Sequence, residues 1–241
     1  MVQGTITVSD LEIMSNAFNY RQWIYHHISS HIGNRILEVG GGIGNFTELL
    51  LDRELVVSID IFRPCVEYMQ GRFRHLPNVI PLQLDIGQPG VRGLKHLAFD
   101  TVVCLNVLEH VEQDVEALCT MSYLLQPGDR LLLLVPAYQW LYGTVDKSLK
   151  HFRRYSRTDL IEKLEQSNLE VESLFYMNSI GVLAWFLNNK VILRQEESRG
   201  QILFFDRFIA PWLSKLESYI PPPFGLSLVS IARKSQTVGS P

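Results

Sequence analysis

The sequence has few cysteines, no long uninterrupted apolar run and no excess of basic residues. Its three cysteines, Cys65, Cys104 and Cys119, are odd in number and lack C-x-x-C spacing, which argues against a disulfide framework and against a zinc ribbon. We therefore expect them to be buried thiols of a protein in a reducing compartment, the cytoplasm.

Membrane and nucleic-acid signals are also missing. The longest apolar and uncharged segment, residues 173–189, is shorter than the roughly 20 residues of a membrane-spanning helix. The first ten residues lack the basic start and the apolar core of a secretory signal. A net charge of -3 gives no general attraction to a polyanion. We predict a cytoplasmic protein with no transmembrane helix and no nucleic-acid partner, and leave peripheral membrane contact and a homo-oligomer open.

What the sequence does contain is an alternation of short apolar runs with helical segments, which is typical of a doubly wound α/β fold. A chain of 241 residues has the size of one domain. Strands are expected at residues 35–39, 55–59, 79–84, 99–104, 129–135, 169–175 and 226–233. Helices are expected at residues 11–30, 44–53, 64–75 and 112–125, and Pro127-Gly128 ends the last of these. A capping box at Ser156 predicts a further helix that runs to residue 168.

The most informative stretch is residues 36–45, an apolar run that ends in an acid and continues with alternate glycines. Gly40, Gly42 and Gly44 permit a tight turn and a close approach to a ligand. Their G-x-G-x-G spacing departs from the G-x-G-x-x-G of dinucleotide sites. Glu38, two residues before the first glycine, would repel a pyrophosphate and favour a positively charged ligand. S-adenosylmethionine carries a sulfonium and an ammonium and no phosphate.

This stretch resembles the cofactor loop of class I S-adenosylmethionine-dependent methyltransferases, and the resemblance continues with Asp60, with Leu84-Asp85-Ile86 and with residues 106–111. The resemblance covers residues 34–235. It implies a Rossmann-like, mostly parallel sheet of seven strands with helices on both faces, whose antiparallel last strand lies between the fifth and the sixth. We predict a methyltransferase domain at residues 34–241, an N-terminal helical cap at 1–33 and a helical lid or interface insertion at 177–224.

The predicted cofactor residues follow the carboxyl ends of strands, where open parallel sheets bind ligands. The resemblance assigns Asp60 to the ribose hydroxyls, Asp85 to the adenine amino group and Asn106 to the methionine moiety. The residues alone leave open that Asp60 caps a helix and that Asp85 is a plain turn residue. Tyr20 and Trp23, on the N-terminal helix, can equally be core residues. The predicted set is Glu38, Gly40, Gly42, Gly44, Asp60, Ile61, Asp85, Ile86, Asn106, Tyr20 and Trp23.

The loop after the fifth strand lies on the side of the sheet where a methyl acceptor is expected. Its candidates for orienting or deprotonating the acceptor are His151, Tyr142 and Tyr155, joined by His110 from the loop after the fourth strand. His110 can instead hold its own loop by hydrogen bonds. An in-line displacement mainly needs aligned reactants, so a base is not required. We expect no metal.

Two features suggest the kind of acceptor. The insertion is strongly apolar, and a basic cluster precedes it, formed by Lys147, Lys150, Arg153, Arg154 and Arg157. We hypothesise methyl transfer to a small apolar molecule, such as a polyketide, an isoprenoid or a lipid, with an anionic end or a carrier. The insertion can also pack on the sheet or on a second subunit, and the basic residues can be a solvated face.

Three other functions stay open. The chain can bind S-adenosylmethionine without catalysis, or use it for a reaction other than methyl transfer, because the cofactor residues speak only to binding. The third is an RNA methyltransferase. Base-modifying amino methyltransferases carry an Asn/Asp-Pro-Pro-aromatic tetrapeptide after the fourth strand, whereas this chain has Asn106-Val107-Leu108-Glu109.

Overall fold

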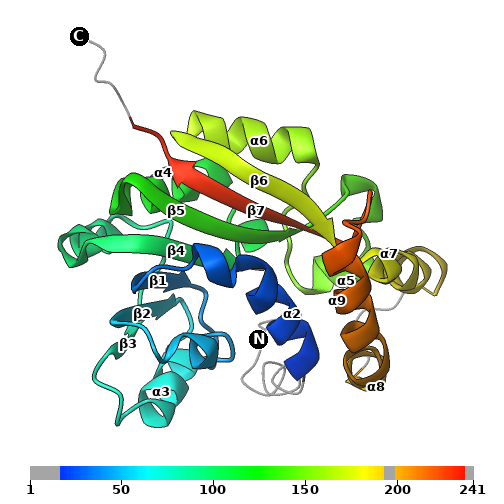
Figure 1. Ribbon diagram of the computed structural model, residues 1–241, viewed down its shortest axis with the longest axis horizontal. Coiled ribbons are helices and arrows are strands. Elements are labelled where there is room, and N and C mark those ends of the chain that lie inside the picture. Colours follow the sequence, from blue (N-terminus) through cyan, green and yellow to red (C-terminus); the bar gives the residue numbers. More distant parts are fainter. Residues whose placement is uncertain (1–16, 193–198, 237–241) are drawn as a thin grey trace.

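The computed structural model describes residues 17–192 and 199–236. Its seven strands form one sheet in the order β3-β2-β1-β4-β5-β7-β6 (Figure 1). β7 is antiparallel to both of its neighbours, and the other pairs are parallel. This confirms the predicted fold class and the place of the last strand. The strands are β1 Arg35–Val39, β2 Leu55–Asp60, β3 Val79–Gln83, β4 Phe99–Leu105, β5 Leu125–Pro136, β6 Leu169–Met177 and β7 Ser227–Lys234.

Helices cover both faces of the sheet. One core contains Leu131 and Leu133 of β5 and packs under α4 and α6, and the other contains Leu132 and Leu134 and packs under α2, α3 and α9. Because neighbouring side chains of a strand point to opposite faces, an uninterrupted apolar run is needed to fill both cores. The helices are α2 Phe18–Ile28, α3 Arg63–Arg72, α4 Asp114–Leu124, α5 Thr144–Ser148, α6 Arg157–Gln166, α7 Ser179–Phe186, α8 Arg199–Phe204 and α9 Ala210–Tyr219.

Shorter turns complete the chain. The 3₁₀ turns are η1 Ser29–His31, η2 Thr47–Leu50, η3 Pro89–Leu97, η4 Leu108–His110 and η5 Gln139–Leu141, and the π turns are η6 Leu187–Val191 and η7 Phe205–Ile209. The predicted capping box is confirmed in part, since the Ser156 hydroxyl accepts a hydrogen bond from the Asp159 amide at 3.1 Å.

One predicted element is wrong, and another begins earlier than expected. The helix expected at residues 44–53 is replaced by the short turn η2. Gly44 has φ +83°, which is outside the helical range, and the chain forms turns from there up to η2. The fifth strand begins at Leu125 instead of residue 129. Gly128, at φ +94°, lets the strand bend through Pro127-Gly128, so this pair lies inside β5 rather than between helix and strand. Residues 11–16 of the predicted N-terminal helix lie outside the described part, and α2 begins at Phe18.

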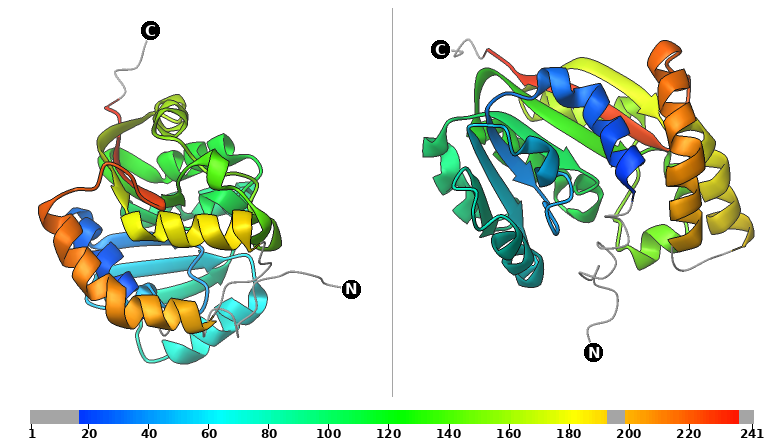
Figure 2. Two further views of the ribbon diagram at one scale, coloured as in Figure 1. Left: turned by 90° about the vertical axis from the view of Figure 1, so that its right-hand side faces the viewer. Right: turned by 60° about the horizontal axis from the view of Figure 1, so that its bottom comes forward.

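The insertion is fastened by two buried acids. The Asp206 carboxylate accepts hydrogen bonds from the Asn19 and Tyr20 amides in the first turn of α2. Glu217 of α9 accepts from the Asn178 and Ser179 amides at the start of α7. Acids at helix N-termini satisfy free amides and the helix dipole. The insertion and α2 therefore lie side by side (Figure 2). Among the described residues, no helix combines the length and the apolar character that crossing a bilayer needs.

Candidate functional site

The glycine loop is held to the end of β2 by its backbone. The Gly40 amide donates to the Ile59 carbonyl at 2.8 Å, and the Gly42 amide donates to Asp60 Oδ2 at 2.8 Å. The Phe62 amide donates to the other carboxylate oxygen of Asp60 at 2.8 Å. Burial raises the pKa of Asp60, and these backbone bonds oppose the rise. The Asp60 carboxylate is therefore fixed in orientation beside the loop.

Two glycines of the loop are required by the protein itself. Gly40 has φ +75°, and a Cβ on it would lie 2.2 Å from Val107 Cγ2. Gly44 has φ +83°, and its Cβ would lie 2.4 Å from the Phe73 ring. An L side chain is strained at such φ values and would also overlap its neighbour. Packing alone explains these glycines, and their contact with a cofactor stays a prediction.

Glu38 lies under the loop and ties three segments together. Its Oε2 accepts hydrogen bonds from Thr47 Oγ1 at 2.5 Å and from Ser58 Oγ at 2.6 Å, and its side chain is buried. Burial raises the pKa of Glu38, against the effect of the two hydroxyl donors. The two hydroxyl partners could not be predicted from the sequence, because they come from η2 and β2. That Glu38 faces a cationic ligand is still a prediction.

The remaining cofactor candidates meet at the same edge of the sheet. Asp85 Oδ1 accepts from the Gly87 amide at 2.8 Å, so Asp85 does make the turn that was the alternative for it. The side chain of Ile86 is buried and that of Ile61 is exposed. Asn106, at φ +54°, is exposed directly after β4. The strand register brings these residues close to the glycine loop without testing their contact with a ligand.

The N-terminal helix contributes less to the site than predicted. Trp23 is 2% exposed, packs in the core under α2 and donates its indole N–H to His27 Nε2 at 2.9 Å. The prediction that Trp23 touches the methionine end or the acceptor does not fit this placement. Tyr20 is half-buried, and its ring packs edge-on against those of Trp23 and Phe205. Core packing explains Trp23, and Tyr20 stays a candidate.

A buried ion cluster holds His151. His151 Nδ1 lies 2.9 Å from Asp146 Oδ1, and Arg154 Nε donates to the same oxygen at 2.7 Å. The Gly143 amide donates to Asp146 Oδ2 at 2.9 Å. Burial acts to raise the pKa of Asp146, but the bonds from His151 and the charge of Arg154 outweigh it and lower the pKa. All members of this cluster come from α5 and from the residues on either side of it, and the sequence pattern does not show that they are buried together.

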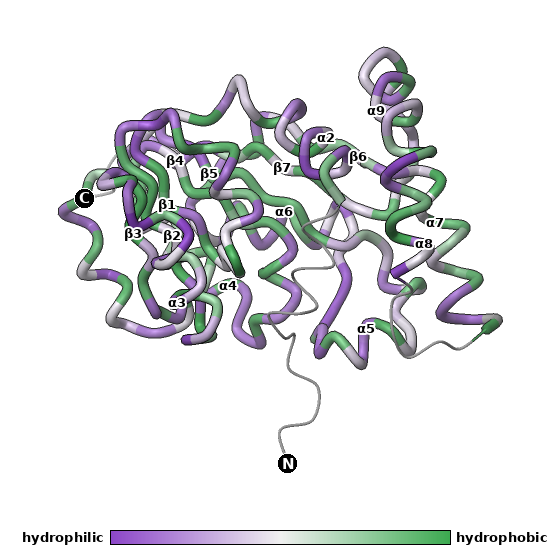
Figure 3. Tube along the Cα trace, turned by 90° about the horizontal axis from the view of Figure 1, so that it is seen from below, coloured by the Kyte–Doolittle hydropathy of each residue, from purple (hydrophilic) through white to green (hydrophobic). Residues whose placement is uncertain are grey.

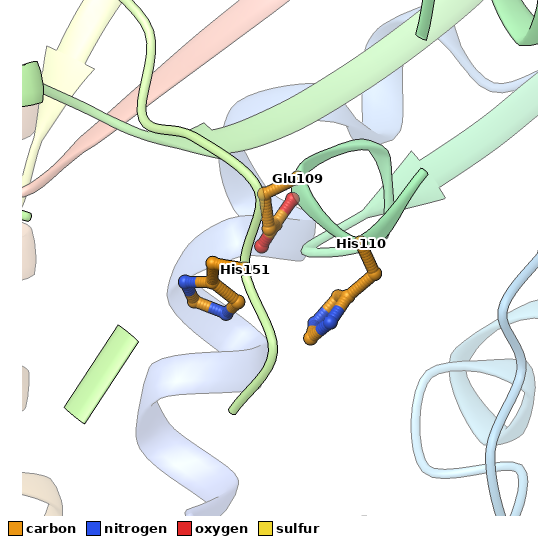
Figure 4. Close-up of side chains that lie close together, drawn as sticks. All are labelled: Glu109, His110 and His151. Atoms are coloured by element: carbon orange, nitrogen blue, oxygen red, sulfur yellow. The ribbon is translucent and has the colours of Figure 1, made fainter. Parts of the chain in front are cut away.

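His110 and Glu109 complete a group around His151. The His110 and His151 rings meet edge-on, with centroids 4.6 Å apart. Burial, helped by the nearby His151, lowers the pKa of His110 to about 4. Burial raises the pKa of Glu109 to about 8, and its Oε2 has no hydrogen-bond partner among the described residues. Figure 4 shows the Glu109 carboxyl group between the two rings. The structure thus brings together two of the predicted catalytic residues, His110 and His151, and places Glu109 beside them.

The two predicted tyrosines have structural partners. Tyr155 is fully buried and donates to Asp114 Oδ2 at 3.0 Å. Burial and the Asp114 charge raise its pKa far above the usual value. Because the Tyr155 side chain is fully buried and its hydroxyl is bonded to Asp114, the prediction that Tyr155 meets an acceptor does not fit this placement. The Tyr142 hydroxyl donates to the His151 carbonyl at 2.7 Å. Tyr142 therefore supports the His151 loop.

The basic cluster is also partly internal. Arg154 is 3% exposed and pairs with Asp146, and Arg153 Nη1 lies 2.6 Å from Asp114 Oδ2. Because these two guanidinium groups already neutralise acids of the protein, they do not offer the predicted site for an anionic acceptor. Lys147, Lys150 and Arg157 are exposed.

The chain matches proteins of known family. A family model described as "Methyltransferase domain" matches residues 25–174. Among curated proteins, the "Probable polyketide synthase 40" of Dictyostelium discoideum is 31% identical over 130 residues, which cover 45% of this chain and 5% of that protein. An uncharacterised protein of Mycobacterium tuberculosis is 31% identical over 132 residues, which cover 51% of this chain and 43% of that protein. The chain thus spans less than half of these relatives.

A solved structure with the same fold is the N-methyltransferase NodS from Bradyrhizobium japonicum in complex with S-adenosylhomocysteine. It has a TM-score of 0.55, is 17% identical, and the match covers 88% of this chain and 84% of NodS. At this identity the likeness concerns the fold. The family-model match spans more than half of the chain and confirms the resemblance read from the glycine loop. The chain belongs to the methyltransferase-domain family of class I S-adenosylmethionine-dependent methyltransferases.

Proposed function

We propose that this protein transfers a methyl group from S-adenosylmethionine to a small acceptor with an apolar body. The observation that carries the proposal is the fixed pairing of the glycine loop with Asp60 at the ends of β1 and β2. A carboxylate held by two backbone amides is pre-oriented to accept further hydrogen bonds from a ligand, at the edge where open parallel sheets bind ligands.

The same edge supplies the rest of the proposed cofactor site. Asp60 accepts hydrogen bonds from the ribose hydroxyls, Asp85 from the adenine amino group, and Asn106 meets the methionine moiety. The buried Glu38 provides negative charge beneath the loop when it is ionised. These residues fit a ligand with hydroxyl and amino donors and a positive centre. When bound, S-adenosylmethionine supplies an electrophilic methyl group.

The proposed acceptor region is apolar. A cavity of about 420 Å³ is lined by Trp140, Ser179, Val182, Leu183, Phe186 and Phe224. The tube through α7 is largely coloured as hydrophobic in Figure 3. Trp140 is 56% and Leu183 is 64% exposed, which is unusual for large apolar side chains gathered at one place. An acceptor with a hydrocarbon body would cover them.

This region is joined to the segment that carries His151. The Arg154 guanidinium lies 4.5 Å from the centre of the Trp185 ring on α7. The Val145 amide donates to Asn189 Oδ1 at 2.9 Å. The insertion is thus coupled to the histidine loop through direct contacts. The sequence similarity to part of a polyketide synthase supports an acceptor of the polyketide type.

The test is release of S-adenosylhomocysteine in the presence of polyketide-like, isoprenoid and fatty acyl acceptors. A methylated product of the expected mass has to appear with it. Leu183→Asp, in the apolar cavity, should raise KM for the acceptor and leave cofactor binding unchanged. Leu216→Asp is the matched control, because Leu216 is a similarly exposed leucine of α9 outside the cavity. Turnover restricted to small polar acceptors would reject the apolar acceptor.

A second candidate is an enzyme that uses the bound cofactor for a reaction other than methyl transfer. Its support is the [4+2]-cyclase SpnF, which shares the fold with a TM-score of 0.61 at 18% identity, over 90% of this chain and 81% of that one. Conversion of an apolar substrate without release of S-adenosylhomocysteine would favour this candidate. Cofactor binding without any conversion would favour a non-catalytic binding protein.

A further inference from the structure

We propose that Glu109, His110 and His151 bind a divalent transition-metal ion, for which zinc is the best match. The three side chains come from two loops, after β4 and after α5, and offer ligand atoms that all lie within 4.8 Å of one another. Figure 4 shows both imidazole rings and the Glu109 carboxyl group turned toward a common space. Two imidazoles and one carboxylate form a frequent ligand set of catalytic zinc and iron sites.

A buried oxygen points to a missing partner. Glu109 is 1% exposed, and its Oε2 accepts no hydrogen bond from any described residue. Buried polar atoms are nearly always paired, because losing water without a replacement costs free energy. A cation between Glu109 and the two rings would satisfy this oxygen.

The supporting contacts are those of a metal-bound histidine. His151 Nδ1 is hydrogen-bonded to Asp146, which leaves Nε2 as the ligand atom. Histidine ligands typically donate their second N–H to a carboxylate or to a carbonyl group, which fixes the ring orientation. Arg154 and the Gly143 amide in turn hold Asp146.

The donor atoms select the class of ion. Two nitrogens and one oxygen suit zinc and its neighbours among the first-row metals, whereas magnesium prefers oxygen ligands alone. Zinc bond lengths place tetrahedral ligand atoms roughly 3.4 Å apart. The side chains therefore have to move toward one another as the ion binds. With three protein ligands, at least one coordination position is left for water or for another oxygen ligand. The sequence shows Glu109 and His110 side by side, but it does not show that His151 from another loop lies next to them.

The experiment measures metal binding without acceptor or cofactor, so its outcome is separate from that of the proposed methyl transfer. Tag-free protein is stripped with a chelator and titrated with Co²⁺, whose visible absorption reports coordination, and Zn²⁺ is then added as a competitor. We expect about one ion per chain with a dissociation constant of roughly 1 µM or below. His151→Ala, His110→Ala and Glu109→Gln should each weaken binding by at least about 100-fold, since loss of a supporting residue alone costs 10 to 100-fold.

His75→Ala is the matched control, because His75 is an exposed histidine that pairs only with a neighbouring side chain in the described structure. Its affinity for Co²⁺ should equal that of the unaltered protein. Glu109→Gln preserves side-chain shape, so it decides the question if a histidine variant loses its fold. Absence of Co²⁺ and Zn²⁺ binding by the folded protein, or equal binding by the folded Glu109→Gln variant, would overturn the proposal.

Discussion

The glycine loop and the His151 segment lie at the same site but are stabilised in different ways. The loop at residues 38–62 is held by backbone amides that bind carbonyls and Asp60. The segment at residues 137–157 is held by buried charges, with Asp146 bound to His151 and Arg154, and Asp114 bound to Arg153. The backbone-built part depends on glycines that permit a tight turn between the ends of β1 and β2. The charge-built part depends on burying Asp146 with His151 and Arg154 of the same segment, and on pairing Asp114 with the distant Arg153.

The largest effect is expected in the charge-built part. Asp146→Ala should lower the free energy of unfolding by about 3 to 5 kcal/mol, because it removes a fully buried carboxylate that neutralises Arg154. Chemical denaturation of the purified variant measures this loss. Glu67→Ala is the control. Glu67 pairs with Arg63 at the same 2.7 Å but on the surface, so we expect a change below about 1 kcal/mol. Equal losses in the two variants would remove the distinction between buried and exposed pairs.

The next effect concerns the backbone-built part. Gly40→Ala places a Cβ 2.2 Å from Val107 Cγ2 at φ +75°. Strain of about 1 to 2 kcal/mol and overlap of about 1 to 3 kcal/mol should lower stability and abolish tight cofactor binding. Gly71→Ala is the matched control, since its Cβ meets nothing within 4 Å and Gly71 lies in α3. Thermal denaturation should show Gly71→Ala stabilised by about 0.5 to 1 kcal/mol. If Gly40→Ala changed neither the stability nor the cofactor binding, the described conformation of the loop would be contradicted.

A smaller, pH-dependent effect is expected at Asp114. Its carboxylate accepts from Tyr155, from Lys163 at 2.6 Å and from Arg153 at 2.6 Å. Burial acts to raise the pKa of Asp114, but the bonds from Lys163 and Arg153 outweigh it and lower the pKa. A lowered pKa contributes stability above the unfolded pKa of about 3.9, and this contribution is lost as pH falls through the folded value.

The test compares the unaltered protein with Asp114→Asn between neutral and acidic pH. At neutral pH the variant should be less stable by about 1.5 to 3 kcal/mol, the range for a hydrogen bond to a charged group. The difference should shrink below a pH of about 4, because the carboxyl group of the unfolded chain then gains a proton and the native one gains it at still lower pH. A difference that stays constant down to acid unfolding would show that the charge of Asp114 is not what stabilises this segment.

The last effect is expected at Asp60, where the change should appear mainly in cofactor binding. Asp60→Ala should weaken S-adenosylmethionine binding by about 1 to 3 kcal/mol, the cost of leaving ligand hydroxyls unpaired. Calorimetry with the variant measures it. Asp52→Ala, at an exposed acid before β2, is the control and should bind as the unaltered protein does. Unchanged affinity of a folded Asp60→Ala would remove Asp60 from the site.

Much of the sheet could be predicted because its signals are local. The apolar runs fix β1 to β7 within a few residues, and the family resemblance supplies the strand order. The errors come from competing local signals. Gly44 adopts a positive φ at the start of the helix predicted for residues 44–53, and Gly128 bends β5 where the pair Pro127-Gly128 was expected to separate a helix from the strand. Glycine at positive φ permits either outcome, and only neighbouring packing selects one.

The sequence by itself determined the fold class, the glycine loop and the family, because these depend on residues close together in the chain. Tertiary structure decided which polar residues reach the site. It buries Tyr155 against Asp114 and Trp23 in the core, and it brings Glu109 to His151. The physical reason is that burial and charge pairing depend on contacts between distant segments, which no local pattern records.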